Sequence, residues 1–312
     1  MTDPTGTQPT LATSAGGSIY DLGYQGYPGR RLGRRDVLLS LFGQTLHACY
    51  GIGRGARAKI VPFTLAGLAL IPAIIAIGIA AIIAQAGPAG SRFDSISPIQ
   101  YHTYASAIAV FVMLFCAAQA PELFGRDQRF GVLPLYFSRG LPRTDYAAAR
   151  MGGLVVGLLL MVLVPQALLF VGRLLTAADP GTGWRLESPN LVPILLQGLL
   201  TVLLLGGISS VIASHTPRRA YATAAIIALF IIPPVIVELV SQTGRSGLGR
   251  YLVLLSPGDI LEHTNGALFR TFADGPDALG RDLPDVAYFV AAIAIIGVTF
   301  GLTIRRYRRI AV

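Results

Sequence analysis

One polar stretch, residues 121–150, carries charged side chains whose types and spacing suit binding to another protein. Glu122 and Arg126 stand four residues apart, so they share one face if the stretch is helical. Arg126, Asp127 and Arg129 offer charge-assisted hydrogen bonds to a soluble partner. The alternative interpretation is an ordinary basic loop whose arginines only orient the chain in a membrane.

The other groups that could do chemistry are isolated. The four histidines have no ligand-like spacing, which predicts that the chain holds no metal: His47, His102, His215 and His263. Cys49 and Cys116 belong to no CxxC pair, so no disulfide framework is expected. The only lysine, Lys59, lies outside any glycine-rich phosphate-binding loop. If ATP drives this protein, another chain must therefore bind the ATP and its Mg²⁺.

The elements that must position the polar stretch are apolar helices. Of the 312 residues, 53% are hydrophobic and 13% are charged, which leaves too little polar surface for a soluble globule of this size. A bilayer core of about 30 Å needs roughly 20 apolar residues per helix. We therefore expect an all-α polytopic membrane protein with six spans, at about 60–86, 102–120, 151–172, 191–214, 220–240 and 286–304.

The predicted spans carry almost no ionisable groups, although an enzyme or an ion-coupled transporter within the bilayer would need them. Glu238 is the exception. It lies near the end of the fifth span, where it either snorkels to the interface or contacts a substrate. In the same span, Pro233 and Pro234 should kink or break the helix. We therefore expect a chain that is not itself an enzyme.

The basic residues predict the orientation of the chain. Of the 25 lysine and arginine residues, 18 fall in the N-terminal segment, the 121–150 loop, the turn at 215–219 and the tail, and 7 fall in the three opposite loops. Loops rich in lysine and arginine remain on the cytoplasmic side of a membrane. Both termini are therefore expected in the cytoplasm, and residues 241–284 on the external side. The arginines flank spans and form no continuous patch, so the net charge of +9 does not indicate nucleic-acid binding.

The N-terminal region divides into two parts. Residues 1–29 are expected to be flexible, and residues 30–59 form a basic segment. Apolar residues recur there at helical spacing, which predicts an amphipathic helix over 36–52 that lies in the membrane interface with its apolar face in the acyl boundary. Basic residues flank this helix: Arg34, Arg35, Arg54, Arg57 and Lys59. The alternative is that the helix packs on a soluble partner.

Several short sequences suggest a family. Residues 19–24 (IYDLGY), 29–35 (GRRLGRR) and 53–60 (GRGARAKI) precede the first span, and 121–124 (PELF) and 133–136 (LPLY) lie between the second and third. In these segments and in its topology, the chain resembles the permeases of actinobacterial-type ABC exporters of the type-2 class.

The resemblance implies a half-transporter of a bacterial plasma membrane. Two copies, or one copy and a related permease, would enclose the translocation path and sit on two separate ATPase subunits. The loop after the second span would be the coupling element, with these residues: Glu122, Arg126, Asp127, Arg129, Tyr136, Arg139, Asp145 and Tyr146.

The resemblance leaves cargo and mechanism open. Apolar faces of the first, second and fifth spans would line the path, which suits amphiphilic drugs or lipids. Family members also carry an external helix between the last two spans, and Ser256 to Asp259 could begin one here, with a loop of no function as the alternative. A rival interpretation from another class is a polytopic facilitator or enzyme scaffold that uses no ATPase.

Overall fold

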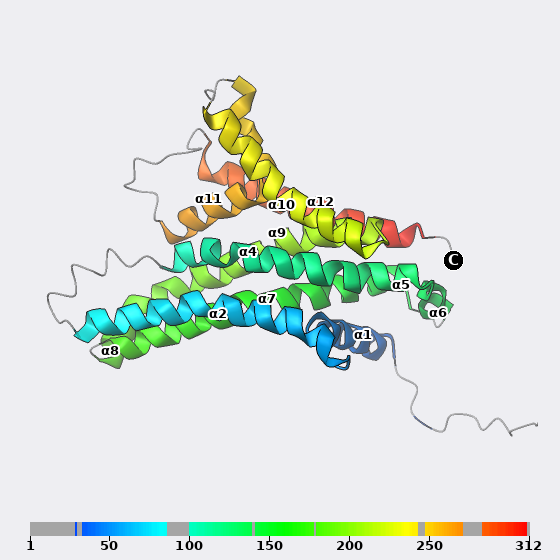
Figure 1. Ribbon diagram of the computed structural model, residues 1–312, viewed down its shortest axis with the longest axis horizontal. Helices are drawn as coiled ribbons and strands as arrows, with labels where there is room; N and C mark the ends of the chain where they lie inside the picture. The colour runs from blue at the N-terminus through cyan, green and yellow to red at the C-terminus, as the bar shows by residue number, and fades with distance from the viewer. Residues whose placement is uncertain are drawn as a thin grey trace, which may run out of the picture.

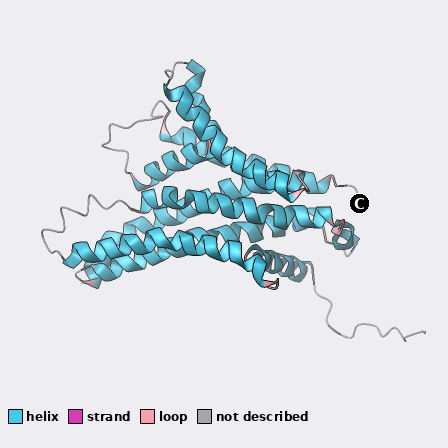
Figure 2. Ribbon diagram, viewed as in Figure 1, coloured by secondary structure: helices cyan, strands magenta, loops and turns pink. Residues whose placement is uncertain are grey.

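The described part of this computed structural model is helical. It comprises residue 29 and residues 33–85, 100–138, 141–177, 179–242, 247–270 and 283–310. All of its regular secondary structure is helix (Figures 1 and 2). The predictions for residues 1–28, Arg139, and much of the two loops around 86–99 and 271–282 lie outside these residues.

Six helices are long and apolar enough to cross a membrane, which confirms the predicted all-α polytopic class. They are α2 (Ala56–Gln85), α4 (Tyr101–Ala120), α7 (Arg143–Thr176), α9 (Leu191–His215), α10 (Arg219–Gln242) and α12 (Asp285–Arg308). The most apolar windows of α4, α7 and α9 are 50% to 56% buried, against 11% to 22% for α2, α10 and α12. The first three therefore form the inside of the bundle and the last three its exposed exterior.

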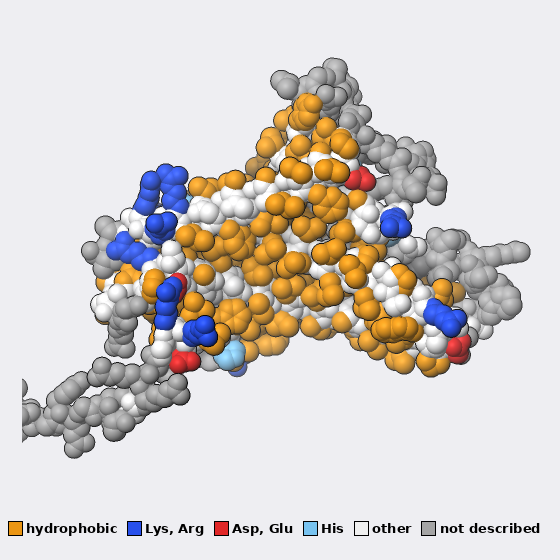
Figure 3. Space-filling model, turned by 180° about the vertical axis from the view of Figure 1, so that it is seen from behind, with side chains coloured by type: hydrophobic (Ala, Val, Ile, Leu, Met, Phe, Trp, Pro, Cys, Tyr) orange, Lys and Arg blue, Asp and Glu red, His pale blue; other side chains and the backbone are white. Residues whose placement is uncertain are grey.

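Successive long helices run in opposite directions, so α1 (Arg34–Cys49) and the last turn of α12 lie at the same end of the bundle (Figure 1). We call this the basic end, and it also holds α5 (Arg126–Arg129) and α6 (Leu133–Ser138). The opposite end, with α8 (Pro180–Glu187), is the far end. An apolar belt separates the two, and basic side chains are visible on both sides of it, more of them on one side than on the other (Figure 3).

The predicted interfacial helix is present as α1, but its apolar face lies on protein. The sequence predicted that this face lies in the acyl boundary of the membrane. In the structure, Leu41 and Cys49 are instead buried against α7. Glycines of α7 make the approach possible, because a Cβ at Gly153 would stand 2.6 Å from Cγ2 of Thr45 and one at Gly157 2.7 Å from Sγ of Cys49. Small residues allow helices to pack this closely within a membrane.

The segment 121–150 is a helical hairpin, where the sequence predicted a loop. The helix of α4 continues through a π-helical turn, η2 (Pro121–Gly125), into α5, and α7 begins at Arg143. Pro121 lacks an amide hydrogen, and the wider turn absorbs that loss without ending the helix. The predicted boundaries at 120 and 151 are therefore too narrow by several residues on each side.

The far end holds three shorter helices besides α8, namely η3 (Ser188–Asn190), η4 (Gly247–Leu255) and α11 (Pro257–Phe269). The expected start of α11 is confirmed, since the Ser256 hydroxyl accepts a hydrogen bond from the amide of Asp259 at 3.3 Å. The helix α10 runs without a break through Pro233 and Pro234, and a kink there stays a prediction.

Candidate functional site

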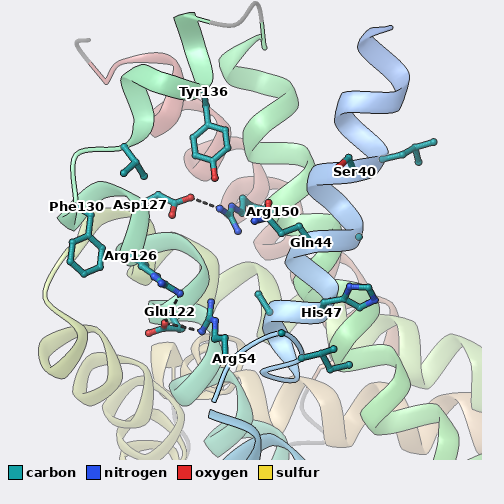
Figure 4. A pocket seen from close by; sticks show the side chains of 16 residues that line it. Ser40, Gln44, His47, Arg54, Glu122, Arg126, Asp127, Phe130, Tyr136 and Arg150 are labelled. Carbon is teal, nitrogen blue, oxygen red and sulfur yellow. Dashed lines mark hydrogen bonds and ion pairs between the residues drawn. The ribbon is translucent and has the colours of Figure 1, made fainter. Parts of the chain in front are cut away.

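A cleft of about 740 Å³ opens at the basic end, between α1 and the hairpin formed by η2, α5 and α6 (Figure 4). From α1, Ser40, Gln44 and His47 line it. From the hairpin and its neighbours, the lining includes four of the predicted coupling residues, Glu122, Arg126, Asp127 and Tyr136, and also Arg54 and Arg150. Half of the eight predicted coupling residues therefore lie around one cavity.

A buried ion pair lies at the back of this cleft. The guanidinium of Arg150 donates to the carboxylate of Asp127, and the side chains of both residues are almost fully buried. The Tyr146 hydroxyl donates to the same carboxylate at 2.6 Å and accepts from Nε of Arg150 at 3.2 Å. Arg150 also donates to the Thr45 hydroxyl at 3.4 Å. Since a buried charge is tolerated only when paired, this network fixes α5 against α7 and α1.

Aromatic side chains connect the same network to the end of the chain. The ring of Tyr146 lies 5.3 Å from that of Tyr307 and 5.4 Å from that of Tyr136. The amide of Gln128 donates to the Tyr307 hydroxyl at 3.2 Å and to the carbonyl of Ser214 at 3.0 Å. The hairpin is therefore held by α7, α9 and α12 together. A displacement of the hairpin would disturb its contacts with all three helices.

Glu122, in the π-helical turn, gathers three arginines. Its carboxylate lies 2.8 Å from Arg54, 3.5 Å from Arg126 and 3.7 Å from Arg219. The contact with Arg126 confirms that these two residues, four apart in the sequence, share one face of a helix. Burial, together with the neighbouring arginines, lowers the pKa of Arg54, although its bond to Glu122 opposes the shift. One carboxylate facing three cations leaves this side of the cleft positive.

A second ion pair joins the first turns of α1 and α7. Arg34 donates to the carboxylate of Asp145 through Nε at 2.5 Å and through Nη2 at 2.8 Å. This hydrogen bonding raises the pKa of Arg34. Arg34 itself is exposed, so water screens the pair and its contribution to stability is small. Its main effect is to fix the register of α1 along α7.

The outer surface of the hairpin carries apolar side chains. Phe130 is 62% exposed and Leu135 66% exposed. The guanidinium of Arg129 lies 4.9 Å above the ring of Phe130, and Arg126 is also exposed. We call Arg126, Arg129, Phe130 and Leu135 the tip.

The predicted coupling residues thus have different surroundings, and Glu122 lies in the cleft with its three arginines. Arg126 and Arg129 lie on the exposed tip, whereas Asp127, Asp145 and Tyr146 are engaged in contacts within the chain. Tyr136 lines the cleft, and Arg139 lies outside the described residues. Of the helix flanks, Arg34 and Arg54 pair with acids, while the other three are exposed: Arg35, Arg57 and Lys59.

Sequence reasoning missed Arg150 as the ion-pair partner of Asp127, and it missed the neighbouring contacts of Thr45 and Tyr307. Arg150 was counted only as a residue that orients the membrane spans, and Tyr307 and Thr45 were not considered. The one available signal was the four-residue spacing of Tyr146 and Arg150, which puts both on one face of α7.

The fold and the site together define a polytopic α-helical membrane protein with a rigidly held helical hairpin at one end. A comparison with models of known protein families finds no match, and a comparison with curated proteins finds none either. The resemblance to exporter permeases therefore depends on the sequence segments given above, and it enters below as a proposal.

Proposed function

We propose that this chain is the membrane-spanning permease subunit of an ATP-binding-cassette exporter in a bacterial plasma membrane. It forms a translocation path with a second permease copy, and separate ATPase chains bind ATP and Mg²⁺. The observation that carries the proposal is the tip, an exposed apolar and cationic surface on a hairpin that is fastened to three membrane helices.

The tip has the composition of a protein interface. Aromatic and arginine side chains dominate binding energy at such interfaces, and exposed apolar residues close to water mark sites that a partner covers. Phe130 and Leu135 provide the apolar part, and Arg126 and Arg129 provide cations for acidic groups of the partner. An ordinary orienting loop would need the arginines but not the exposed Phe130.

The contacts inside the hairpin allow a displacement of the tip to reach the membrane helices. When nucleotide binding brings the ATPase chains together, they push on the tip. The buried pair of Arg150 and Asp127 passes the displacement to α7, and Tyr307 passes it to α12. The helices then exchange an inward-open for an outward-open arrangement, provided that the two arrangements bind nucleotide with different affinity.

The hydrolytic chemistry belongs to the partner in this account. The present chain recruits the ATPase chains and transmits their movement to the membrane helices, and its own residues touch no reacting phosphate. The rival function, a facilitator or scaffold without an ATPase, needs no partner at the tip.

Affinity purification of the chain from its native membranes tests the proposal. We expect a second chain with a Walker A loop to co-purify and to hydrolyse ATP. Arg126→Glu and Arg129→Glu should reduce its recovery, whereas Arg185→Glu, a charge reversal on the exposed face of α8 at the far end, should not. Purification of a correctly inserted chain with no nucleotide-binding partner would favour the rival.

A further inference from the structure

A second cavity, of about 230 Å³, lies inside the membrane bundle, away from the cleft at the basic end. It is partly open and is lined by the first half of α4, the middle of α7 and α9, and the facing sides of α10 and α11. Most of its lining is apolar, with Ile108, Val112, Val162 and Leu205 among its walls. Such a lining suits the hydrocarbon part of a ligand.

Polar atoms without partners point to a ligand in this cavity. Thr201 is 6% exposed and Asn265 is 3% exposed, and both line it. Oγ1 of Thr201 and Oδ1 of Asn265 are buried and make no hydrogen bond within the described chain. Each such atom costs about 1 to 3 kcal/mol when nothing compensates it. Oδ2 of Asp259 is likewise buried without a hydrogen bond, and Asp259 lines the same cavity.

The charges around the cavity have one sign. Asp259 and Glu262 stand three residues apart on α11, and both line it. Among the residues that the structure describes, the lining of this cavity includes no lysine, arginine or histidine. Asp259 lies in the first turn of α11. The unpartnered oxygens of Thr201 and Asn265 and the carboxylates of Asp259 and Glu262 therefore present electron pairs to a positive group.

We propose that this cavity binds cargo in which an organic cation is joined to an apolar body. The ammonium group lies between Asp259 and Glu262, next to the oxygens of Asn265 and Thr201, and the apolar part lies against Ile108 and Val112. The volume admits a compact head with a short apolar segment. The role of this binding in transport rests on the proposed function, whereas the binding itself needs only this chain.

Close packing of α10 against α11 shapes one wall. A Cβ at Gly258 would stand 3.7 Å from Cγ of Pro234, and both residues line the cavity. Pro234, the second proline of the pair that the sequence singled out, therefore belongs to the wall of this site. Movement of α10 relative to α11 would open or close it.

Binding of benzyltrimethylammonium to the purified permease in lipid nanodiscs, without ATPase and followed by calorimetry, tests the inference. Asp259→Asn and Asn265→Leu should each weaken binding by about tenfold or more, and Thr201→Val, which keeps the side-chain shape, by less. Asp285→Asn removes an equal charge from an exposed position at the start of α12 and should change nothing. Benzenesulfonate, an anion of similar size, should not bind.

Equal affinity of wild type, Asp259→Asn and Thr201→Val for the cation would overturn the inference, as would equal binding of the sulfonate. Thermal unfolding of each variant identifies any that fail to fold, and the isosteric Thr201→Val keeps the test decisive in that case. Because the assay omits the ATPase, the two proposals fail separately. If no nucleotide-binding partner co-purifies with the wild-type chain, the proposed function is wrong and this site is untouched, whereas failure of the cation to bind leaves the proposed function standing.

Discussion

The hydroxyl of Tyr307, in the last turns of α12, donates a hydrogen bond to the backbone carbonyl of Phe124 in the π-helical turn at 3.2 Å. The two residues are 183 positions apart in the sequence. Through this contact the last membrane helix is attached to the hairpin between the second and third. Since Tyr307 is fully buried, the contact is part of the core and not a surface association.

Removal of this hydroxyl should uncouple the two elements without unfolding the protein. In Tyr307→Phe the ring still packs on Tyr146, but Phe124 loses its donor and Gln128 loses one acceptor. We expect a loss of about 1 to 2 kcal/mol in stability, measured by thermal unfolding in detergent. The ATPase should still co-purify, with weaker stimulation of transport. Unchanged stability and transport would show that the contact transmits nothing.

The buried ion pair should behave as a unit. Arg150→Met leaves the Asp127 carboxylate buried without its cation, which costs about 3 to 5 kcal/mol. Replacing both residues, with Asp127→Leu in addition, should cost much less than the sum of the single changes. A double-mutant cycle on unfolding temperatures measures the coupling. Additive effects would mean that the two side chains contribute independently.

The contact between α1 and α7 predicts a chemical signal from Cys49. This thiol is fully buried, and burial raises its pKa, so it should resist maleimide at neutral pH. Gly153→Val should push α1 away, because even a Cβ there meets Thr45 at 2.6 Å. The exposed thiol then recovers a lower pKa and reacts faster. Gly43→Ala, on an open face of α1, is the control and should leave Cys49 unreactive.

The only tryptophan, Trp184, reports on α8 at the far end. Asp179 caps this helix by accepting a hydrogen bond from the amide of Thr182 at 2.9 Å, and its bonds to Thr182 lower its pKa. A lowered pKa means that the cap stabilises α8 above the ordinary pKa of aspartate and is lost as the pH falls through the lowered value. Trp184 emission should therefore stay constant down to about pH 4 and change below it. Asp179→Asn should abolish this change, and an unaltered titration in that variant would assign it to another group.

The sequence predicted the elements of this fold better than their contacts. Apolar runs of membrane length predicted all six spans, and Ser256 followed by Pro257 predicted the start of α11. The hairpin was predicted as a loop because Pro121 and the charges after it look like the end of a helix, whereas a π-helical turn lets the helix continue.

The contacts within the site depend on tertiary packing. Asp127 and Arg150 meet only because α5 folds back on α7, so no local spacing indicates their pairing. Thr201 and Asn265 are neutral, and a search of the apolar spans for charge does not find them. Their significance appears only when α11 packs against α9 and leaves a cavity between them.

The side of the membrane on which the hairpin lies tests the central claim most directly. Both native cysteines are buried, so single cysteines at Ser138 and Arg185, which are exposed at the basic and far ends, can be labelled selectively. With a membrane-impermeant maleimide, intact cells should label Arg185→Cys and not Ser138→Cys, and inside-out vesicles should show the reverse. Labelling of Ser138→Cys in intact cells would place the tip outside, where no ATP-driven partner could reach it, and would contradict the account.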